Sequence, residues 1–168
     1  MPSMHRATVP VLVRGLKILS TLLEKGEAHA KETGQDPAEL LAARLAPDML
    51  ALVGQIQRVS DTAKGAIGRL TDVTPPAMPD DETTFADLQA RIAKTIAFLE
   101  SVDPEAFDGA KKREVTLKAG PFEAKMSGED CLLGFVLPNF YFHLTTAYGI
   151  LRHQGVPVGK LDYLGSLG

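Results

Sequence analysis

Cysteine and clustered charge are both scarce in this sequence of 168 residues. A single cysteine, Cys131, excludes an internal disulfide, and its apolar neighbours favour a buried, unreactive thiol. The 18 basic and 21 acidic residues are interspersed along the chain and give a net charge of −3. Because the basic face that a phosphate backbone requires is missing, we expect no nucleic-acid partner.

Long hydrophobic runs and the common catalytic motifs are also missing. No stretch approaches the roughly 20 apolar residues of a membrane span, and the first residues lack the apolar core of a signal peptide. We therefore expect a cytoplasmic protein with no membrane partner. There is no glycine-rich phosphate loop, Gly-x-Ser-x-Gly elbow, His-Glu-x-x-His pair or cysteine pair, which disfavours the enzyme classes that need them.

The sequence does contain clear helical periodicity. Hydrophobic residues make up 45% and charged residues 23%, which suits one globular domain over residues 1–168. Apolar residues recur at spacings of three and four, bounded by capping residues and by prolines in first turns. These signals predict helices at residues 8–34, 36–44, 47–70, 84–99 and 127–154.

Two further segments complete the expected fold. The prolines within residues 74–81 forbid a helix there and predict an extended crossover. Residues 114–126 alternate polar and apolar side chains on both sides of a turn, which predicts a β-hairpin. We therefore expect a mainly α-helical protein, a four-helix bundle with a small β-hairpin inserted before the last helix.

The last helix carries the candidate functional residues. Pro138 should kink it, because proline removes a backbone hydrogen bond and clashes with the carbonyl of Gly134. Asn139 and His143 follow, one turn apart, on a stripe shared with Phe142 that we expect to face the bundle interior. Burying either polar group alone costs about 1–3 kcal/mol, so each should be hydrogen-bonded, hydrated or ligated.

The second long helix offers partners for this pair. Gln57 borders its core face, and Asp61 lies one turn further along. In a catalytic or ligand-binding site, His143 would be a general base or ligand, Asn139 an orienting amide, and Asp61 the group that fixes the imidazole. In a structural network, the same polar groups would instead set the register of the helices. A metal site of one His, one Asn and one Gln would be weak, because amide oxygens are poor ligands for zinc-type ions.

Three segments of the sequence resemble a known family: residues Arg44–Met49, Asn139–His143 and Leu151–Pro157. Through them the chain resembles the DinB-like (YfiT-like) helical-bundle superfamily, whose members are described as metal-dependent enzymes. It resembles more closely the bacterial family known as domain of unknown function 1993. The resemblance spans nearly the whole chain and implies the bundle fold.

The resemblance also implies a changed metal site. In the superfamily the last helix carries two histidines one turn apart, and the second helix carries a third. The resemblance places His143 at the second of these positions, Asn139 at the first, and Gln57 near the third. It implies a remodelled polar pocket without an intact three-histidine site, so that a divalent ion such as Zn or Ni would have only His143 as a ligand. It further implies a homodimer that packs helices across a two-fold axis.

Two functional hypotheses follow from these observations. The first is a dimeric helical module in which the polar residues around His143 are structural. The alternative is a small-molecule or metal-dependent enzyme, with His143 and Asp61 as candidate catalytic residues and Asn139 and Gln57 as further ligand-binding residues. A cavity beside His143 that opens to solvent would favour the second hypothesis.

Overall fold

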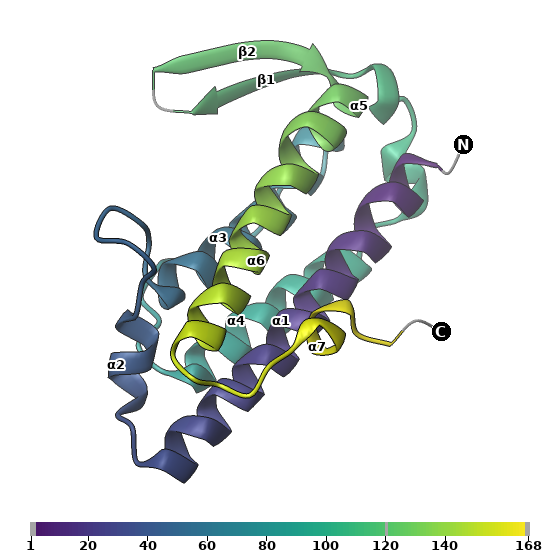
Figure 1. Ribbon diagram of the computed structural model, residues 1–168. Helices are drawn as coiled ribbons and strands as arrows, with labels where there is room; N and C mark the ends of the chain where they lie inside the picture. Colours follow the sequence, from purple (N-terminus) through teal and green to yellow (C-terminus); the bar gives the residue numbers. More distant parts are fainter. Residues whose placement is uncertain (1–2, 120, 167–168) are drawn as a thin grey trace.

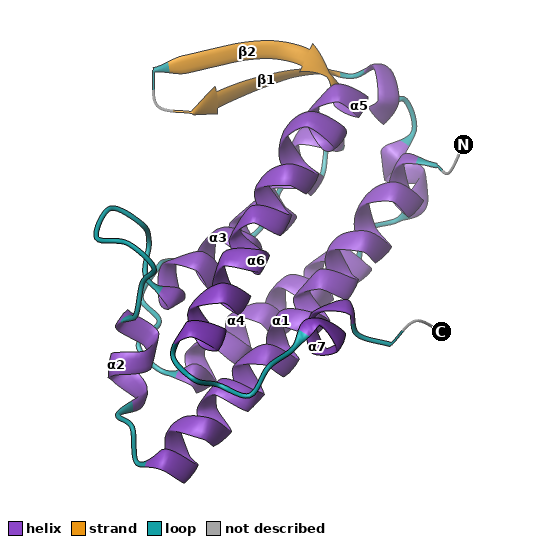
Figure 2. Ribbon diagram, in the orientation of Figure 1, coloured by secondary structure: helices purple, strands orange, loops and turns teal. Residues whose placement is uncertain are grey.

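Four long helices form the body of the protein in the computed structural model, which describes residues 3–119 and 121–166. They are α1 (Met4–Thr33), α3 (Leu52–Leu70), α4 (Phe85–Glu100) and α6 (Leu137–His153). The shorter elements are α2 (Pro37–Ala42), two 3-10 turns (Pro104–Phe107 and Ala110–Lys112), β1 (Glu114–Ala119), β2 (Phe122–Ser127), α5 (Gly128–Cys131) and α7 (Lys160–Leu164). Figure 1 shows the long helices side by side, and Figure 2 shows the hairpin at one end of them. The predicted helical bundle with a hairpin before its last helix is confirmed.

Local capping signals explain several helix ends. The side chain of Asp36 accepts a hydrogen bond from the backbone N–H of Ala38 (2.8 Å) at the start of α2. Thr84 and Asp87 form a capping box at the start of α4. Helix α1 ends at Gly34, whose φ of 74° lies in the left-handed region that glycine adopts without strain.

The start of α3 differs from the prediction. The Pro47-Asp48 signal predicted a helix from residue 47, whereas α3 begins at Leu52 and residues 43–51 form a loop. The backbone N–H of Leu52 donates to the carbonyl of Ala43 (2.9 Å), and the guanidinium of Arg44 donates to two carbonyls within the loop. These bonds satisfy the backbone without a helix, so the local starting signal has no effect here.

The apolar faces of the long helices meet in one buried core. Helix α3 packs against α4 and α6, and α1 packs against α4 and α6. Helices α1 and α6 approach closely at Gly15, where an added Cβ would lie 2.3 Å from Cε1 of Phe140. The largest fully buried side chains are Phe140, Leu12, Leu16, Leu19, Leu22, Leu23, Leu40, Leu52, Ile56, Ile67, Leu70 and Leu88. No helix in the described ranges combines the length and apolar character needed to cross a membrane.

A widened turn precedes α6 where the sequence predicted a proline kink. Residues Leu132–Val136 form a π-helix that joins α5 to α6, and the N–H of Leu137 bonds to the carbonyl of Leu132, five residues earlier. Pro138 then lies in the first turn of α6. A proline needs no N–H partner in a first turn, so the change of helical pitch accommodates it.

The hairpin is attached to the bundle at its base. Its strands pair antiparallel, from Glu114 opposite Ser127 to Ala119 opposite Phe122. Val115 is buried beside the helices, and Phe122, near the far end, is exposed. Gly128 permits tight packing at the base, because an added Cβ there would lie 2.0 Å from the carbonyl oxygen of Ala110.

Candidate functional site

The polar pair of α6 lies on the flank of the helix that faces α3. Phe140 and Leu144 form part of the buried face, whereas Asn139 and His143 are half-buried. Phe142, which we expected on the same inward stripe, is 56% exposed, so that expectation is wrong. Each residue of a helix projects about 100° from the one before it, so Phe142 projects about 200° from Phe140. Because Phe140 lies in the core, Phe142 points outward.

Asn139 and His143 each bond to a side chain of α3. The amide nitrogen of Asn139 donates to Oγ1 of Thr62 (2.7 Å), and Thr62 in turn donates to the carbonyl of Arg58. Nδ1 of His143 lies 2.7 Å from Oε1 of Gln55, a residue that is almost fully buried. The two bonds tie α6 to α3 at positions one turn apart on α6 and two turns apart on α3.

The tautomer of His143 follows from its partner. The amide nitrogen of Gln55 donates to the carbonyl of Leu50 (3.1 Å), which leaves Oε1 of Gln55 to accept from the imidazole. Nδ1 of His143 therefore carries the proton. Burial, and then the positive charge of Arg58, lower the pKa of His143 below its usual value. The imidazole is thus neutral at pH 7 and held in one tautomer.

Gln57 and Asp61 are not part of this arrangement. The amide nitrogen of Gln57 donates to Oε2 of Glu82 (2.8 Å), and Oδ1 of Asp61 lies 2.8 Å from the guanidinium of Arg91. Of the four predicted site residues, the structure brings Asn139 and His143 to α3, but it joins them to Thr62 and Gln55. Residues 55 and 62 are seven apart and share one flank of α3, whereas residue 57 projects about 200° from residue 55.

Gln57 and Asp61 instead belong to a charge cluster that sequence reasoning missed. Its centre is Arg91 of α4, which is 3% exposed. The Arg91 guanidinium contacts Asp61 (2.8 Å), Glu82 (2.8 Å) and Asp80 (3.0 Å). Asp80 lies in the proline-rich crossover and Glu82 directly follows it, so the cluster fixes that crossover to α3 and α4. An arginine within the apolar stripe of α4 was the available signal.

The donor groups near His143 do not fit the divalent ion that the wider superfamily implies. Nδ1 of His143 is engaged by Gln55, and the amide nitrogen of Asn139 is engaged by Thr62. Across residues 3–119 and 121–166, no group of three or more His, Cys, Asp or Glu side chains is placed to hold a metal ion. One imidazole nitrogen surrounded by amide and hydroxyl groups is a poor set of ligands for zinc or nickel.

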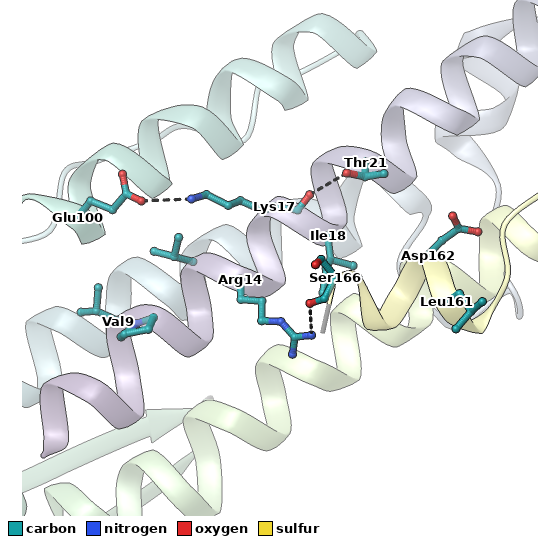
Figure 3. Close-up of a pocket in the computed structure, with 12 residues that line it drawn as sticks. Val9, Arg14, Lys17, Ile18, Thr21, Glu100, Leu161, Asp162 and Ser166 are labelled. Atoms are coloured by element: carbon teal, nitrogen blue, oxygen red, sulfur yellow. Dashed lines mark hydrogen bonds and ion pairs between the residues drawn. The ribbon is translucent and has the colours of Figure 1, made fainter. Parts of the chain in front are cut away.

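The described cavities lie away from the polar pair. A groove of about 740 Å³ runs between α1, α4 and α7, and Figure 3 shows Lys17 reaching toward Glu100 at one side of it and Arg14 toward Ser166 at the other. A second cavity of about 710 Å³ lies between the proline-rich crossover and α4. A third, of about 350 Å³, lies beside the start of α1. None of these three is lined by Asn139 or His143.

Comparisons with known proteins agree with this fold. The family model described as domain of unknown function (DUF1993) matches residues 4–164. A solved structure of a DinB family member protein from Shewanella denitrificans is 39% identical in sequence, with a TM-score of 0.91. That similarity covers 98% of this chain and 93% of the other. None of the curated proteins matches the chain. The chain therefore belongs to the DUF1993 family and is DinB-like in fold.

Proposed function

We propose that this protein is a homodimeric helical module in which Asn139 and His143 lock α6 against α3. One observation carries the structural role of the pair: each side chain is bonded to a side chain of α3, Asn139 to Thr62 and His143 to Gln55, at 2.7 Å. The bonds join residues 77 and 88 positions apart in the chain. Buried polar contacts of this kind specify one register of two helices, because a slip leaves their groups unsatisfied.

Replacing His143 by Ala tests the structural role. Gln55 is almost fully buried, so the change leaves its amide oxygen without a donor. We expect the free energy of unfolding, measured with urea, to fall by about 1–3 kcal/mol. His153→Ala is the matched control, because His153 is exposed at the end of the same helix; its effect should stay within about 0.5 kcal/mol.

The alternative function is a small-molecule enzyme or binder centred on His143. The observation that supports it is the neutral imidazole of His143. Its Nε2 carries no proton and is the atom that would act as a general base. On that hypothesis His143→Ala keeps wild-type stability and instead abolishes ligand binding. Wild-type stability of the variant would therefore contradict the structural lock.

The homodimer is supported by the outer face of α6. No charged residue occurs between Cys131 and Leu151, and Leu133, Tyr141 and Phe142 are exposed along this stretch. Exposed apolar and aromatic side chains along an uncharged stretch of helix are typical of a protein interface.

Light scattering coupled to size exclusion, at micromolar concentration, tests the dimer. We expect twice the mass of one chain for the wild type and a shift toward the monomer for Phe142→Asp, which places a charge on the apolar face. Leu161→Asp, a change at an exposed leucine of α7, is the control and should leave the mass unchanged. A monomeric wild type would contradict the dimer while leaving the Asn139–His143 lock in place.

A further inference from the structure

The hairpin extends from the bundle with open strand edges. Figure 1 shows both strands reaching beyond the helices, joined to them only at the end near α5. Within the described residues the sheet consists of β1 and β2 alone, so each strand has an unpaired outer edge. A two-stranded hairpin is marginally stable in water, and an open edge is a template for another strand.

The charges on β1 are arranged symmetrically. Glu114, Thr116 and Lys118 are exposed on one face of the strand, and Val115 and Leu117 lie on the other. Reading outward from Thr116 in the two directions gives an apolar residue and then a charge, acidic on one side and basic on the other. A strand with this pattern is complementary to an antiparallel copy of itself.

We propose that the outer edge of β1 pairs antiparallel with β1 of a second copy of this chain, with Thr116 on the two-fold axis. Glu114 then lies opposite the partner's Lys118, and Val115 lies opposite the partner's Leu117. Opposite charges and threonine pairs facing each other across strands both favour pairing. The contact rests on the homodimer proposed above and sets the relative orientation of its two chains.

Charge complementarity selects the register on β1, and the threonine at its centre favours β1 over β2. If Leu117 instead of Thr116 lay on the two-fold axis, Thr116 would lie opposite the partner's Lys118. Both ion pairs between Glu114 and Lys118 of the two copies would then be lost. On the centre proposed, each charge of β1 has an opposite charge on both sides, because Lys118 already pairs with Glu123 (3.2 Å) and Glu114 with Lys125 (3.2 Å) inside each hairpin. The corresponding centre of β2 would be Ala124, which also places Glu123 opposite the partner's Lys125 but has no hydroxyl to bond across the axis.

The pairing also fixes how the two bundles sit. A two-fold axis perpendicular to the sheet keeps the apolar faces of both hairpins on one side. Because Val115 is buried against its own helices, both bundles lie on that same side of the four-stranded sheet. This placement on one side of the sheet allows the helix contacts that the proposed dimer requires.

Cysteine cross-linking tests the pairing. Residues directly opposite in an antiparallel pair have Cα atoms about 4.5–5.5 Å apart, which a disulfide can bridge. Thr116→Cys, mildly oxidised, should therefore give a covalent dimer. Lys125→Cys is the matched control, since it is exposed on the same face of the neighbouring strand but would lie about 14 Å from its copy, three strand spacings away. The native Cys131 is buried and does not compete.

We expect Thr116→Cys to form on the order of tenfold more cross-linked dimer than Lys125→Cys. Equal cross-linking of the two variants, or cross-linking through Ala124→Cys instead, would overturn the β1 pairing. Light scattering separates this result from the proposal it depends on. A dimeric wild type without preferential Thr116→Cys cross-linking refutes only the strand contact, and a monomeric wild type refutes both.

Discussion

Replacing Arg91 by Met should lower the free energy of unfolding by about 3–5 kcal/mol, the usual cost of breaking a buried ion pair from one side. Arg91 is almost fully buried and contacts Asp61, Asp80 and Glu82 within 3.0 Å. Methionine matches the length of the side chain but removes the charge, so the Glu82 carboxylate stays buried without its main partner. The proline-rich crossover would then lose its ion pair to α4.

The free energy of unfolding at acid pH gives a second measure of the same charge cluster. Burial alone would raise the pKa of Glu82, but hydrogen bonds from Arg91 and Gln57 hold it below its usual 4.5. A lowered folded-state pKa contributes stability that is fully present above the unfolded value and is lost as the pH falls through the folded value. Glu82 therefore loses its stabilising contribution at pH values below about 4.5. In Arg91→Met this acid-dependent loss of stability should be smaller.

Urea unfolding of Arg91→Met beside Lys17→Met makes the comparison direct. Lys17 forms an exposed ion pair with Glu100 (3.5 Å), and such pairs contribute about 0–1 kcal/mol. If both variants lose less than about 1 kcal/mol, the charge cluster does not hold the crossover in place.

Phe140→Ala should destabilise the protein by a similar amount, about 3–5 kcal/mol. Its ring is fully buried and lies against Gly15 of α1, so truncation leaves a cavity where α1 and α6 approach closely. Phe122→Ala is the control, because Phe122 is 75% exposed near the end of the hairpin; its effect should be within about 0.5 kcal/mol. Equal effects in urea unfolding would mean that the packing of α6 is assigned to the wrong face.

The sequence predicted the elements whose signals are local. Asp36 and Thr84 each start a helix through a hydrogen bond to a residue two or three positions away, so the capping pattern alone identifies them. The start of α3 could not be predicted in this way. It depends on a bond from Leu52 to Ala43 and on Arg44 binding loop carbonyls, and neither contact is visible in a local pattern.

The candidate site was predicted in part for the same reason. The spacing of Asn139 and His143 on one helix is local, and it predicted that each is hydrogen-bonded, hydrated or ligated; in the structure both bond to side chains of α3. Which residues of α3 meet them depends on the rotation of α3 about its axis, and a shift of two positions separates Gln55 from the predicted Gln57. The charge cluster joins residues 61, 80, 82 and 91 from three segments, so only the folded chain brings it together.

The structural lock between α6 and α3 is tested most directly by a double-mutant cycle on Gln55 and His143. Urea unfolding of Gln55→Ala, His143→Ala and the double variant isolates the interaction between the two side chains. We predict a coupling free energy of about 0.5–3 kcal/mol, because each single change leaves the other group unsatisfied. A coupling free energy of zero, with wild-type stability in His143→Ala, would contradict the lock and leave His143 free to serve a ligand.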